Sequence, residues 1–529
     1  MEHSITIYEQ NRIELQKKLD SEKSQDERNR LGQFATPKPL ALDILQYAST
    51  MLPSNLEIRF LDPAFGTGAF YSALTSVFPR KRITEALGYE IDSHYGKPAM
   101  DIWKNYELTI NIDDFTKTHP SSRFNLIICN PPYVRHHHIE YKNKIRLQQQ
   151  AMESSSIKIS GLAGLYCYFL LLSHTWMCDD GIAGWLIPSE FMDVNYGKGL
   201  KNYLLNKVTL LHIHRFDPSD VQFSDALVSS AVVWFRKSLP LKNHSVIFSF
   251  GGNLSQPNIS RHIPVTMLLK ESKWTRFPNS RNKKQKKVPT ISDFFQIKRG
   301  IATGGNSYFI LNAEEIASRN LPMEMFKPIL PSPRYLPNRE ILSDENGFPL
   351  LERQLFLLDI RLQEDEIEHR YTMLSDYLEY GKSLGIHQRY LCRHRKPWYY
   401  QENRPPSPIV CTYMGRRDAK GGSPFRFILN KSQATIPNVY LAMYPTSVLK
   451  REIDNNSELI DKIWKILNQI TPEMLIDEGR VYGGGLHKLE PKELANVDAS
   501  MIAALIPGFK LKPKGQQLSL FESSNGVTP

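Results

Sequence analysis

The sequence lacks the features that mark membrane and secreted proteins. Its 529 residues contain no run of about 18 apolar residues, which is the length that a transmembrane helix needs. The first 30 residues are polar and of mixed charge, so they do not resemble a secretory signal. None of the five cysteines forms a C-x-x-C pair, which argues against a disulfide framework and a cysteine zinc site. We therefore expect a cytoplasmic protein with reduced thiols, no membrane contact and no metal.

The net positive charge is concentrated in the second half of the chain. Residues 1–240 hold 26 Lys and Arg against 26 Asp and Glu, so the net charge of +11 lies entirely in residues 241–529. This uneven distribution favours a protein in which the basic region binds a polyanion such as nucleic acid and the neutral region has a different function.

Strand and helix patterns alternate between about residues 39 and 236. Short β-rich runs predict strands at 57–61, 85–91, 108–112, 125–129, 182–187, 208–213 and 227–235. Helical patterns lie between most of them, at about 39–51, 67–77, 163–178 and 196–206. Alternating βα units predict an α/β fold with a doubly wound, mostly parallel sheet of seven strands. Ligands of such sheets bind beyond the carboxyl ends of the strands, so the residues after each strand carry the functional predictions.

The first predicted strand is followed by a glycine-rich turn. After Asp62 the chain reads Pro-Ala-Phe-Gly66-Thr-Gly68 and then enters a predicted helix. Glycines let a backbone turn tightly and approach a ligand closely. The third position of a dinucleotide-binding G-x-G-x-x-G motif is Tyr71 here, and no Walker P-loop is present, so neither nucleotide motif applies. On its own this turn indicates either a ligand loop or only a structural turn.

Acidic residues end the next two predicted strands. Glu90 ends the second strand, where a carboxylate can accept hydrogen bonds from a ribose diol. Asp113 and Asp114 end the third strand, where a carboxylate can accept from an adenine amino group while Phe115 packs on the ring. Each acid alone is more often a loop or capping residue. Acids in register after successive strands favour a nucleoside-binding site.

The most specific chemical signal follows the fourth predicted strand, which leads directly into Asn130-Pro131-Pro132-Tyr133. The prolines fix φ and remove N–H donors, which leaves backbone carbonyls free to accept. The carbonyl oxygen of Asn130 and a proline carbonyl can together hold both hydrogens of a planar amino group, and this makes the nitrogen lone pair available for attack. Tyr133 provides a face on which a base can stack. The segment therefore predicts chemistry on an exocyclic amino group.

In this order, the four segments resemble the motifs of the S-adenosylmethionine-dependent amino-methyltransferases. The preceding run, Leu31-Gly-Gln-Phe-Ala-Thr36-Pro37, resembles a segment that lies N-terminal to the cofactor loop in the gamma-class DNA adenine methyltransferases. That class also has a large C-terminal target-recognition domain. Segments at 298–309, 396–400, 436–440 and 480–494 are similar to such domains in type II restriction–modification methyltransferases, above all in the BsuBI/PstI group.

The resemblance and the composition together imply a division of the chain. We expect an N-terminal helical extension over 1–30 and a methyltransferase catalytic domain over 31–240. A basic linker over 241–290 would lead to a mixed α+β DNA target-recognition domain over 291–510. The polar tail over 511–529 is expected to be disordered.

The resemblance also implies roles for individual residues in the methylation of adenine N6 within duplex DNA. S-adenosylmethionine would contact Thr36, Asp62, Ala64, Gly66, Gly68, Glu90, Ile91, Asp114 and Phe115. The target adenine would be flipped out of the duplex and held by the segment from Asn130 to Tyr133. Its ring would stack on Tyr133 and on a second aromatic, either Tyr196 or Phe191. The DNA would be contacted by Arg299, Arg416, Arg417 and Lys488.

Several alternatives stay open, and some are disfavoured. Cytosine-C5 methylation needs a cysteine nucleophile, usually after a proline, and no cysteine here follows a proline. Cytosine-N4 transfer is chemically possible, and Asn-Pro-Pro-Tyr also serves RNA and protein-glutamine methyltransferases. A restriction endonuclease acting separately is a possible partner. The tail peptide from Gln517 to Phe521 resembles the short peptide by which bacterial proteins dock on the replication sliding clamp.

Overall fold

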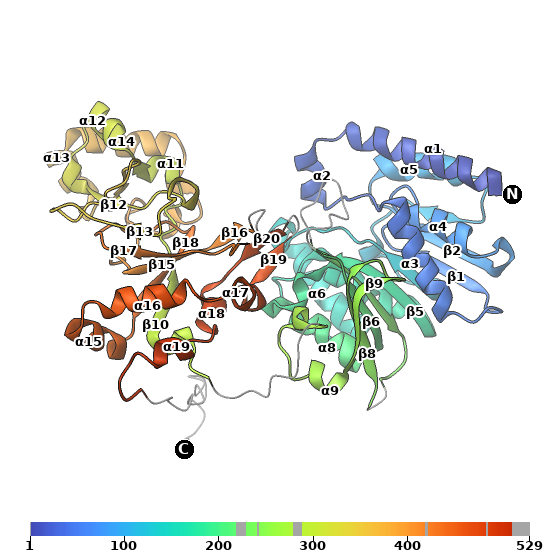
Figure 1. Ribbon diagram of the computed structural model, residues 1–529. Helices are drawn as coiled ribbons and strands as arrows, with labels where there is room; N and C mark the ends of the chain where they lie inside the picture. The colour runs from blue at the N-terminus through green and yellow to red at the C-terminus, as the bar shows by residue number, and fades with distance from the viewer. Residues whose placement is uncertain are drawn as a thin grey trace, which may run out of the picture. The chain divides into compact units, whose positions relative to one another are not determined.

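The computed structural model describes residues 2–217, 229–240, 243–278, 288–417, 422–482 and 485–509, with side chains from residue 8 onward. The chain divides into two compact units (Figure 1). Unit 1 comprises Met1–Lys283 and Arg480–Leu486, and unit 2 comprises Lys284–Gly479 and His487–Pro529. The tail peptide from Gln517 to Phe521 and the basic run at 281–287 lie outside the described residues.

Unit 1 is built on a nine-stranded sheet whose order is β3-β2-β1-β4-β5-β7-β6-β8-β9. Its strands are β1 (Ile58–Asp62), β2 (Ile83–Tyr89), β3 (Thr109–Asn111), β4 (Phe124–Cys129), β5 (Met177–Pro188), β6 (Thr209–Arg215), β7 (Ser230–Arg236), β8 (Ser245–Gly252) and β9 (Pro257–Pro264). Strands β1 to β5 pair in parallel, whereas β7 runs antiparallel to both β5 and β6. The carboxyl ends of β1 to β4 therefore meet at one edge of the sheet.

The sheet has nine strands where the sequence predicts seven. The two further strands, β8 and β9, lie at 245–264, inside the stretch that was expected to be a basic linker. Strand β9 pairs only with β8 among the described residues and is mostly exposed, so its polar sequence suits an edge strand. An edge strand with little buried surface carries no strong apolar alternation, and this is why the sequence pattern did not reveal it.

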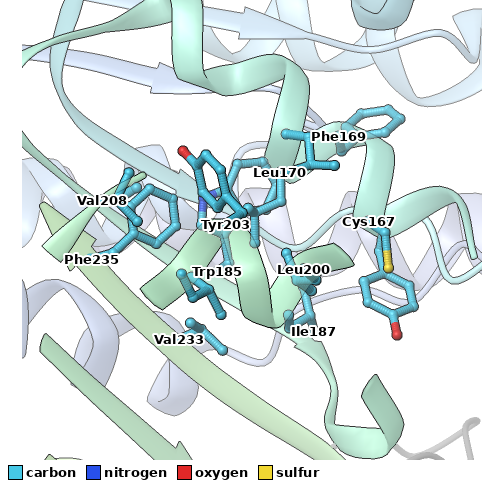
Figure 2. Packing of buried hydrophobic residues seen from close by; sticks show 14 of the residues in the cluster. Cys167, Phe169, Leu170, Trp185, Ile187, Leu200, Tyr203, Val208, Val233 and Phe235 are labelled. Atoms are coloured by element: carbon cyan, nitrogen blue, oxygen red, sulfur yellow. The ribbon is translucent and has the colours of Figure 1, made fainter. Parts of the chain in front are cut away.

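Helices cover both faces of this sheet. They are α3 (Lys38–Met51), α4 (Ala69–Val77) and α5 (Ser93–Trp103) on one face, and α6 (Tyr141–Ser155), α7 (Leu165–Leu172) and α8 (Lys198–Asn206) on the other. Strand residues alternate between the faces, because Leu126 packs in the cluster with α3 while Ile127 packs in the cluster with α7. Figure 2 shows the second cluster, where Trp185 of β5, Tyr203 of α8 and Phe235 of β7 lie close together.

The N-terminal extension is helical and is part of unit 1. It forms α1 (Glu2–Ser21) and α2 (Gln25–Leu31). Arg12 is buried in an ion pair with Glu9 at 2.7 Å, and its Nη1 donates to the Thr67 hydroxyl at 3.1 Å. The Tyr95 hydroxyl, on α5, donates to Asp20 at 2.9 Å. These contacts attach α1 to the glycine turn and to α5.

Unit 2 is a mixed α+β domain. Its larger sheet has the order β10-β18-β15-β17-β13, and a smaller one has the order β11-β14-β12. The strands are β10 (Phe295–Arg299), β11 (Ile310–Leu311), β12 (Phe326–Ile329), β13 (Glu340–Ile341), β14 (Leu355–Leu358), β15 (Ile409–Thr412), β17 (Phe427–Asn430) and β18 (Tyr440–Pro445). Unit 2 also contains the short strand β16 (Met414–Arg416). Two further short strands are β19 (Arg480–Tyr482), which belongs to unit 1, and β20 (Leu486–Lys488), which begins with the last residue of unit 1.

The helices of unit 2 are short, and they bury separate clusters against the two sheets. They are α10 (Ile291–Phe294), α11 (Asn306–Phe309), α12 (Ala313–Ser318), α13 (Glu364–Arg370), α14 (Thr372–Ser383), α15 (Ser447–Asn455), α16 (Leu459–Leu467), α17 (Pro472–Glu478), α18 (Pro491–Ala495) and α19 (Ser500–Ala503). The remaining α-helix of unit 1 is α9 (Val265–Leu268). Across the described ranges, we find no helix that is both long enough and apolar enough to cross a bilayer.

Candidate active site

A cavity of about 810 Å³ opens at the carboxyl ends of the parallel strands of unit 1. Its wall is formed by the residues that follow β1, β2, β3 and β4, together with the first two helices and α6. Doubly wound sheets bind ligands at this edge, because their strands all deliver loops there. The predicted site residues on the wall are Ala64, Gly66, Glu90, Ile91, Asp114, Phe115, Asn130 and Pro132.

The two glycines of the turn have different roles. Gly66 has a φ of 57°, and a Cβ built on it would meet nothing within 4 Å, so its backbone faces open space on the cavity wall. Gly68 has a φ of 89°, and a Cβ there would lie 2.6 Å from both the Phe65 ring and Trp103. Gly66 can therefore admit a ligand against the backbone, whereas Gly68 is required for packing.

Two carboxyl groups, one buried and one half-buried, organise the same region. Asp62 is only 1% exposed and does not line the cavity; it accepts from the N–H of Ala64 at 3.1 Å. Burial, together with the nearby Glu90 carboxylate, raises the pKa of Asp62 to about 8. Glu90 does line the cavity and accepts at 2.8 Å from the N–H groups of Gly66 and Asp92. Burial also raises the pKa of Glu90.

Beside Glu90 the cavity wall is apolar. The Ile91 side chain is 68% exposed, so its apolar face is available to a flat ligand. Phe115 lines the cavity from the next strand end and packs its ring on Tyr89 and Phe169, at centroid distances of 5.6 and 5.5 Å. These side chains suit a nucleoside ring held between apolar surfaces.

Both aspartates after β3 line the cavity. Asp114 accepts from the N–H and the hydroxyl of Thr116, at 2.9 and 2.7 Å, and so caps the short turn that follows. Asp113 is exposed, and it accepts from the N–H of Asp114 at 2.7 Å. The assignment of Asp114 rather than Asp113 to a ligand stays a prediction.

Asn130 is held in a defined orientation. Its Nδ2 donates to the Phe34 carbonyl at 3.0 Å and to the Thr36 hydroxyl at 3.1 Å. A carbonyl can only accept, so the amide nitrogen must face it, and the Oδ1 must point the other way. That Oδ1 is buried and has no hydrogen-bond partner among the residues that the structure describes. Buried polar atoms are rarely left unsatisfied, so this oxygen is placed for a ligand donor.

The rest of the 130–133 loop is anchored to its surroundings. The Tyr133 N–H donates to the Gly32 carbonyl at 3.1 Å, and its hydroxyl donates to the Leu186 carbonyl at 3.2 Å. The Tyr133 ring is 8% exposed and lies outside the cavity wall, as does Pro131. Pro132 lines the cavity. The stacking of a base on Tyr133 stays a prediction.

The two candidates for a second stacking aromatic are placed differently from each other. Phe191 is completely buried in the core of unit 1, where it packs without facing the cavity. Tyr196 is half-buried; its hydroxyl donates to Glu190 and lies 3.5 Å from the Tyr166 hydroxyl. Neither residue lines the cavity. The complete burial of Phe191 supports a packing role, which leaves the half-buried Tyr196 as the more accessible candidate.

One wall of the cavity comes from residues that the sequence analysis did not single out. Lys23 donates to Asp92 and, at 3.3 Å, to Gln33, which itself donates to Asp92 at 2.8 Å. Partial burial acts to raise the pKa of Asp92, but the hydrogen bonds from Lys23 and Gln33 lower it overall. Asp20 and Tyr95 complete this polar wall. Gln33 could have been predicted to line the site, because it belongs to the Gly-Gln-x-x-Thr-Pro segment. The mixed polar pattern of α1 does not indicate that this helix contributes to the cavity.

In unit 2 the structure brings together two of the four predicted DNA-contacting residues. The Arg299 guanidinium lies 4.2 Å from the centre of the Tyr413 ring, and the Lys488 Nζ lies 5.1 Å from it. Lys488 also pairs with Glu490 at 2.8 Å. The other two are exposed: Arg416, and Arg417, which pairs with Glu473 at 3.0 Å. No pattern in the sequence indicates that Tyr413 lies beside Arg299 and Lys488.

Comparison with known proteins covers both units. Residues 81–222 match the family model described as Eco57I restriction-modification methylase, and residues 266–514 match that of the C-terminal domain of the type II methyltransferase M.Eco57I. The type II methyltransferase M.AccI of Acinetobacter calcoaceticus is 28% identical over 490 residues, which cover 89% of this chain and 85% of the relative. The chain is therefore similar to type II restriction–modification methyltransferases over most of its length.

Further relatives match over different lengths. M.XamI of Xanthomonas campestris pv. amaranthicola is 27% identical over 88% of this chain and 84% of its own length. M.BsuBI of Bacillus subtilis is 28% identical over 37% of this chain and 42% of its own length, so the expected likeness to the BsuBI group extends over part of the chain. The type IIL restriction–modification enzyme MmeI, solved in complex with DNA, shares the fold with a TM-score of 0.54 at 12% identity, covering 91% of this chain and 70% of that one.

Proposed function

We propose that this protein transfers a methyl group from S-adenosylmethionine to the N6 amino group of an adenine in a specific sequence of duplex DNA. The observation that carries the proposal is the buried Oδ1 of Asn130 on the cavity wall, which has no hydrogen-bond partner among the residues that the structure describes. The amino group of a base is a hydrogen-bond donor, so it can supply the hydrogen that this Oδ1 can accept.

The residues present fit S-adenosylmethionine. Open space at the Gly66 backbone admits a ligand, the Glu90 carboxylate can accept from ribose hydroxyls, and the exposed Ile91 can cover an adenine ring. Asp113 or Asp114 can accept from the adenine amino group, with Phe115 beside them. When bound, this cofactor supplies a methyl group that is already activated by its positive sulfur.

The chain's own residues then act mainly by positioning. The Oδ1 of Asn130 accepts one hydrogen of the target amino group, and a proline carbonyl of the 130–133 loop accepts the other. Accepting both hydrogens favours a more tetrahedral nitrogen whose lone pair is available for in-line transfer. The amino nitrogen gains the methyl group and loses one proton. No cysteine nucleophile is required, in keeping with the burial of Cys129 in strand β4.

Duplex DNA as the substrate has separate support. The whole net charge of +11 lies in residues 241–529, and Arg299 and Lys488 meet at Tyr413. MmeI, whose fold the chain shares, was solved in complex with DNA. A base inside the duplex cannot reach a cavity of this kind, so the target adenine is flipped out. Tyr133, with Tyr196 as a second candidate, would then stack on it. A separate restriction endonuclease of the same specificity is the expected partner.

Modification-sensitive sequencing tests this function. DNA is sequenced from methylation-free bacteria that express the wild type, Asn130→Ala or the surface control Asn202→Ala, whose side chain is exposed on α8. We expect N6-methyladenine at one recurring sequence with the wild type and the control, and none with Asn130→Ala. If N4-methylcytosine is found at such a sequence instead, the target base is cytosine and not adenine. An absence of modified bases, with cofactor binding intact, would favour an RNA or protein-glutamine substrate.

A further inference from the structure

We infer that Thr36 is a positioning residue whose hydroxyl orients the amide of Asn130. The resemblance to the methyltransferases implies a contact between Thr36 and the cofactor, and that contact stays a separate prediction. Thr36 is only 8% exposed and is not among the residues that line the cavity. Its hydroxyl oxygen accepts from the Nδ2 of Asn130 at 3.1 Å. The inference rests on the proposed function, in which Asn130 acts on the target amino group.

The two hydrogens of the Asn130 amide have separate acceptors. One is directed to the Phe34 carbonyl at 3.0 Å and the other to the Thr36 hydroxyl. With both hydrogens engaged, the Oδ1 is the part of the amide left for a ligand, and it is the atom found without a partner in the described part of the chain. Rotating the amide by half a turn would oppose the Oδ1 to the Phe34 carbonyl, and two acceptors repel. The Thr36 hydroxyl accepts a second hydrogen bond from the amide nitrogen. The amide can bond to both the Thr36 hydroxyl and the Phe34 carbonyl only when its nitrogen faces them and its Oδ1 points away.

The backbone that carries Thr36 is held against the 130–133 loop independently of this hydroxyl. The Gly32 carbonyl accepts from the Tyr133 N–H at 3.1 Å. A Cβ on Gly32 would lie 2.4 Å from the Tyr133 nitrogen, so the two backbones are in close contact. Pro37 then stands at the N-cap position of α3, where its carbonyl accepts from the Ala41 N–H at 3.0 Å. Removing the Thr36 hydroxyl therefore changes one hydrogen bond to Asn130 without releasing the segment.

The test compares Thr36→Val, which keeps the shape and removes the hydroxyl, with Thr36→Ser, which keeps the hydroxyl. Thr75→Val is the matched control, because the Thr75 hydroxyl bonds within α4 and lies outside the cavity wall. Three quantities are measured on each full-length protein: the single-turnover methylation rate at saturating cofactor and DNA, the Kd for S-adenosylmethionine by calorimetry, and the melting temperature.

We expect Thr36→Val to lower the single-turnover rate about fivefold to tenfold, the effect of one net hydrogen bond. Because the rate is measured at saturating cofactor, a change in the Kd for S-adenosylmethionine does not contribute to this loss. Thr36→Ser should recover most of the rate, and Thr75→Val should match the wild type. If Thr36→Val does not fold, Thr36→Ala removes the same hydroxyl without adding a methyl group, and the same results are expected of it.

Two results would overturn the inference. One is a tenfold weaker Kd for S-adenosylmethionine with an unchanged rate at saturation, which would make Thr36 a cofactor ligand. The other is an equal loss of rate in Thr36→Ser and Thr36→Val, or no loss in either, which would show that the hydroxyl does not orient the amide. Failure of the proposed function is distinguishable from both, because the wild type itself would then leave adenine unmodified before any variant is compared.

Discussion

Replacing Gly32 by alanine should impair the active site as well as the stability of the fold. Gly32 has a φ of 67° and ends helix α2. An alanine Cβ would lie 2.4 Å from the Tyr133 nitrogen and 2.8 Å from its carbonyl carbon, both backbone atoms that cannot rotate away. Restoring an ordinary contact requires the two backbones to separate by about 1 Å, which would weaken the hydrogen bond between Tyr133 and Gly32.

The magnitude has two parts. Holding alanine at positive φ costs about 1–2 kcal/mol. The backbone clash adds about 1–3 kcal/mol, part of which is relieved by moving the 130–133 loop. Because Asn130 is bonded to the same segment through Phe34 and Thr36, its amide moves with it. A misplacement of about 1 Å at a reacting group can lower a rate about a hundredfold.

Gly385 provides a matched control for the backbone strain. It has a φ of 68°, and a Cβ on it would meet nothing within 4 Å, so Gly385→Ala carries the strain without the clash. We expect Gly385→Ala to lower the free energy of unfolding by about 1–2 kcal/mol with the methylation rate unchanged. Gly32→Ala should lower the single-turnover rate by about a hundredfold. Equal methylation rates in the two variants would refute the claim that the Gly32 contact positions the 130–133 loop.

Three further predictions concern stability, the cofactor and DNA. Burial lowers the pKa of His212 to about 3 and that of His214 to about 4, so both stay neutral in the folded protein while histidines of the unfolded chain protonate near pH 6.5. Their contribution to the free energy of unfolding is complete above about pH 6.5 and falls by about 4 kcal/mol in total by pH 5. The free energy of unfolding in urea should therefore fall over that range by about 2 kcal/mol less in His212→Gln than in the wild type. An equal fall in the two proteins would contradict this. Lys23→Met should weaken S-adenosylmethionine binding several-fold in calorimetry, because Lys23 holds Asp92 and Gln33 at the cavity wall, whereas the exposed Lys17→Met should not. Arg299→Gln should weaken DNA binding and reduce its salt dependence by about one ion, with cofactor binding unchanged; an unaltered salt slope would place Arg299 away from the phosphates.

Local patterns in the sequence were sufficient for the central architecture. The seven expected strands are all present, because buried parallel strands are short apolar runs bounded by turns, and such runs can be read without tertiary information. The residues after β1 to β4 do converge on one cavity, as the parallel arrangement requires. The pattern could not show β9, since an exposed edge strand needs no apolar alternation.

The chemical groups at the carboxyl edge of the sheet can be identified from the sequence: the turn at Gly66, the carboxylate of Glu90 and the amide of Asn130. The tertiary structure sets which neighbours contact and orient these groups. In the folded protein the Thr36 hydroxyl contacts Asn130, Phe191 is buried in the core, and Lys23 of the N-terminal extension lies beside Asp92. A motif fixes residue types and their spacing along the chain. Contacts between segments as far apart as Thr36 and Asn130 depend on how the whole chain packs, and no local pattern records that.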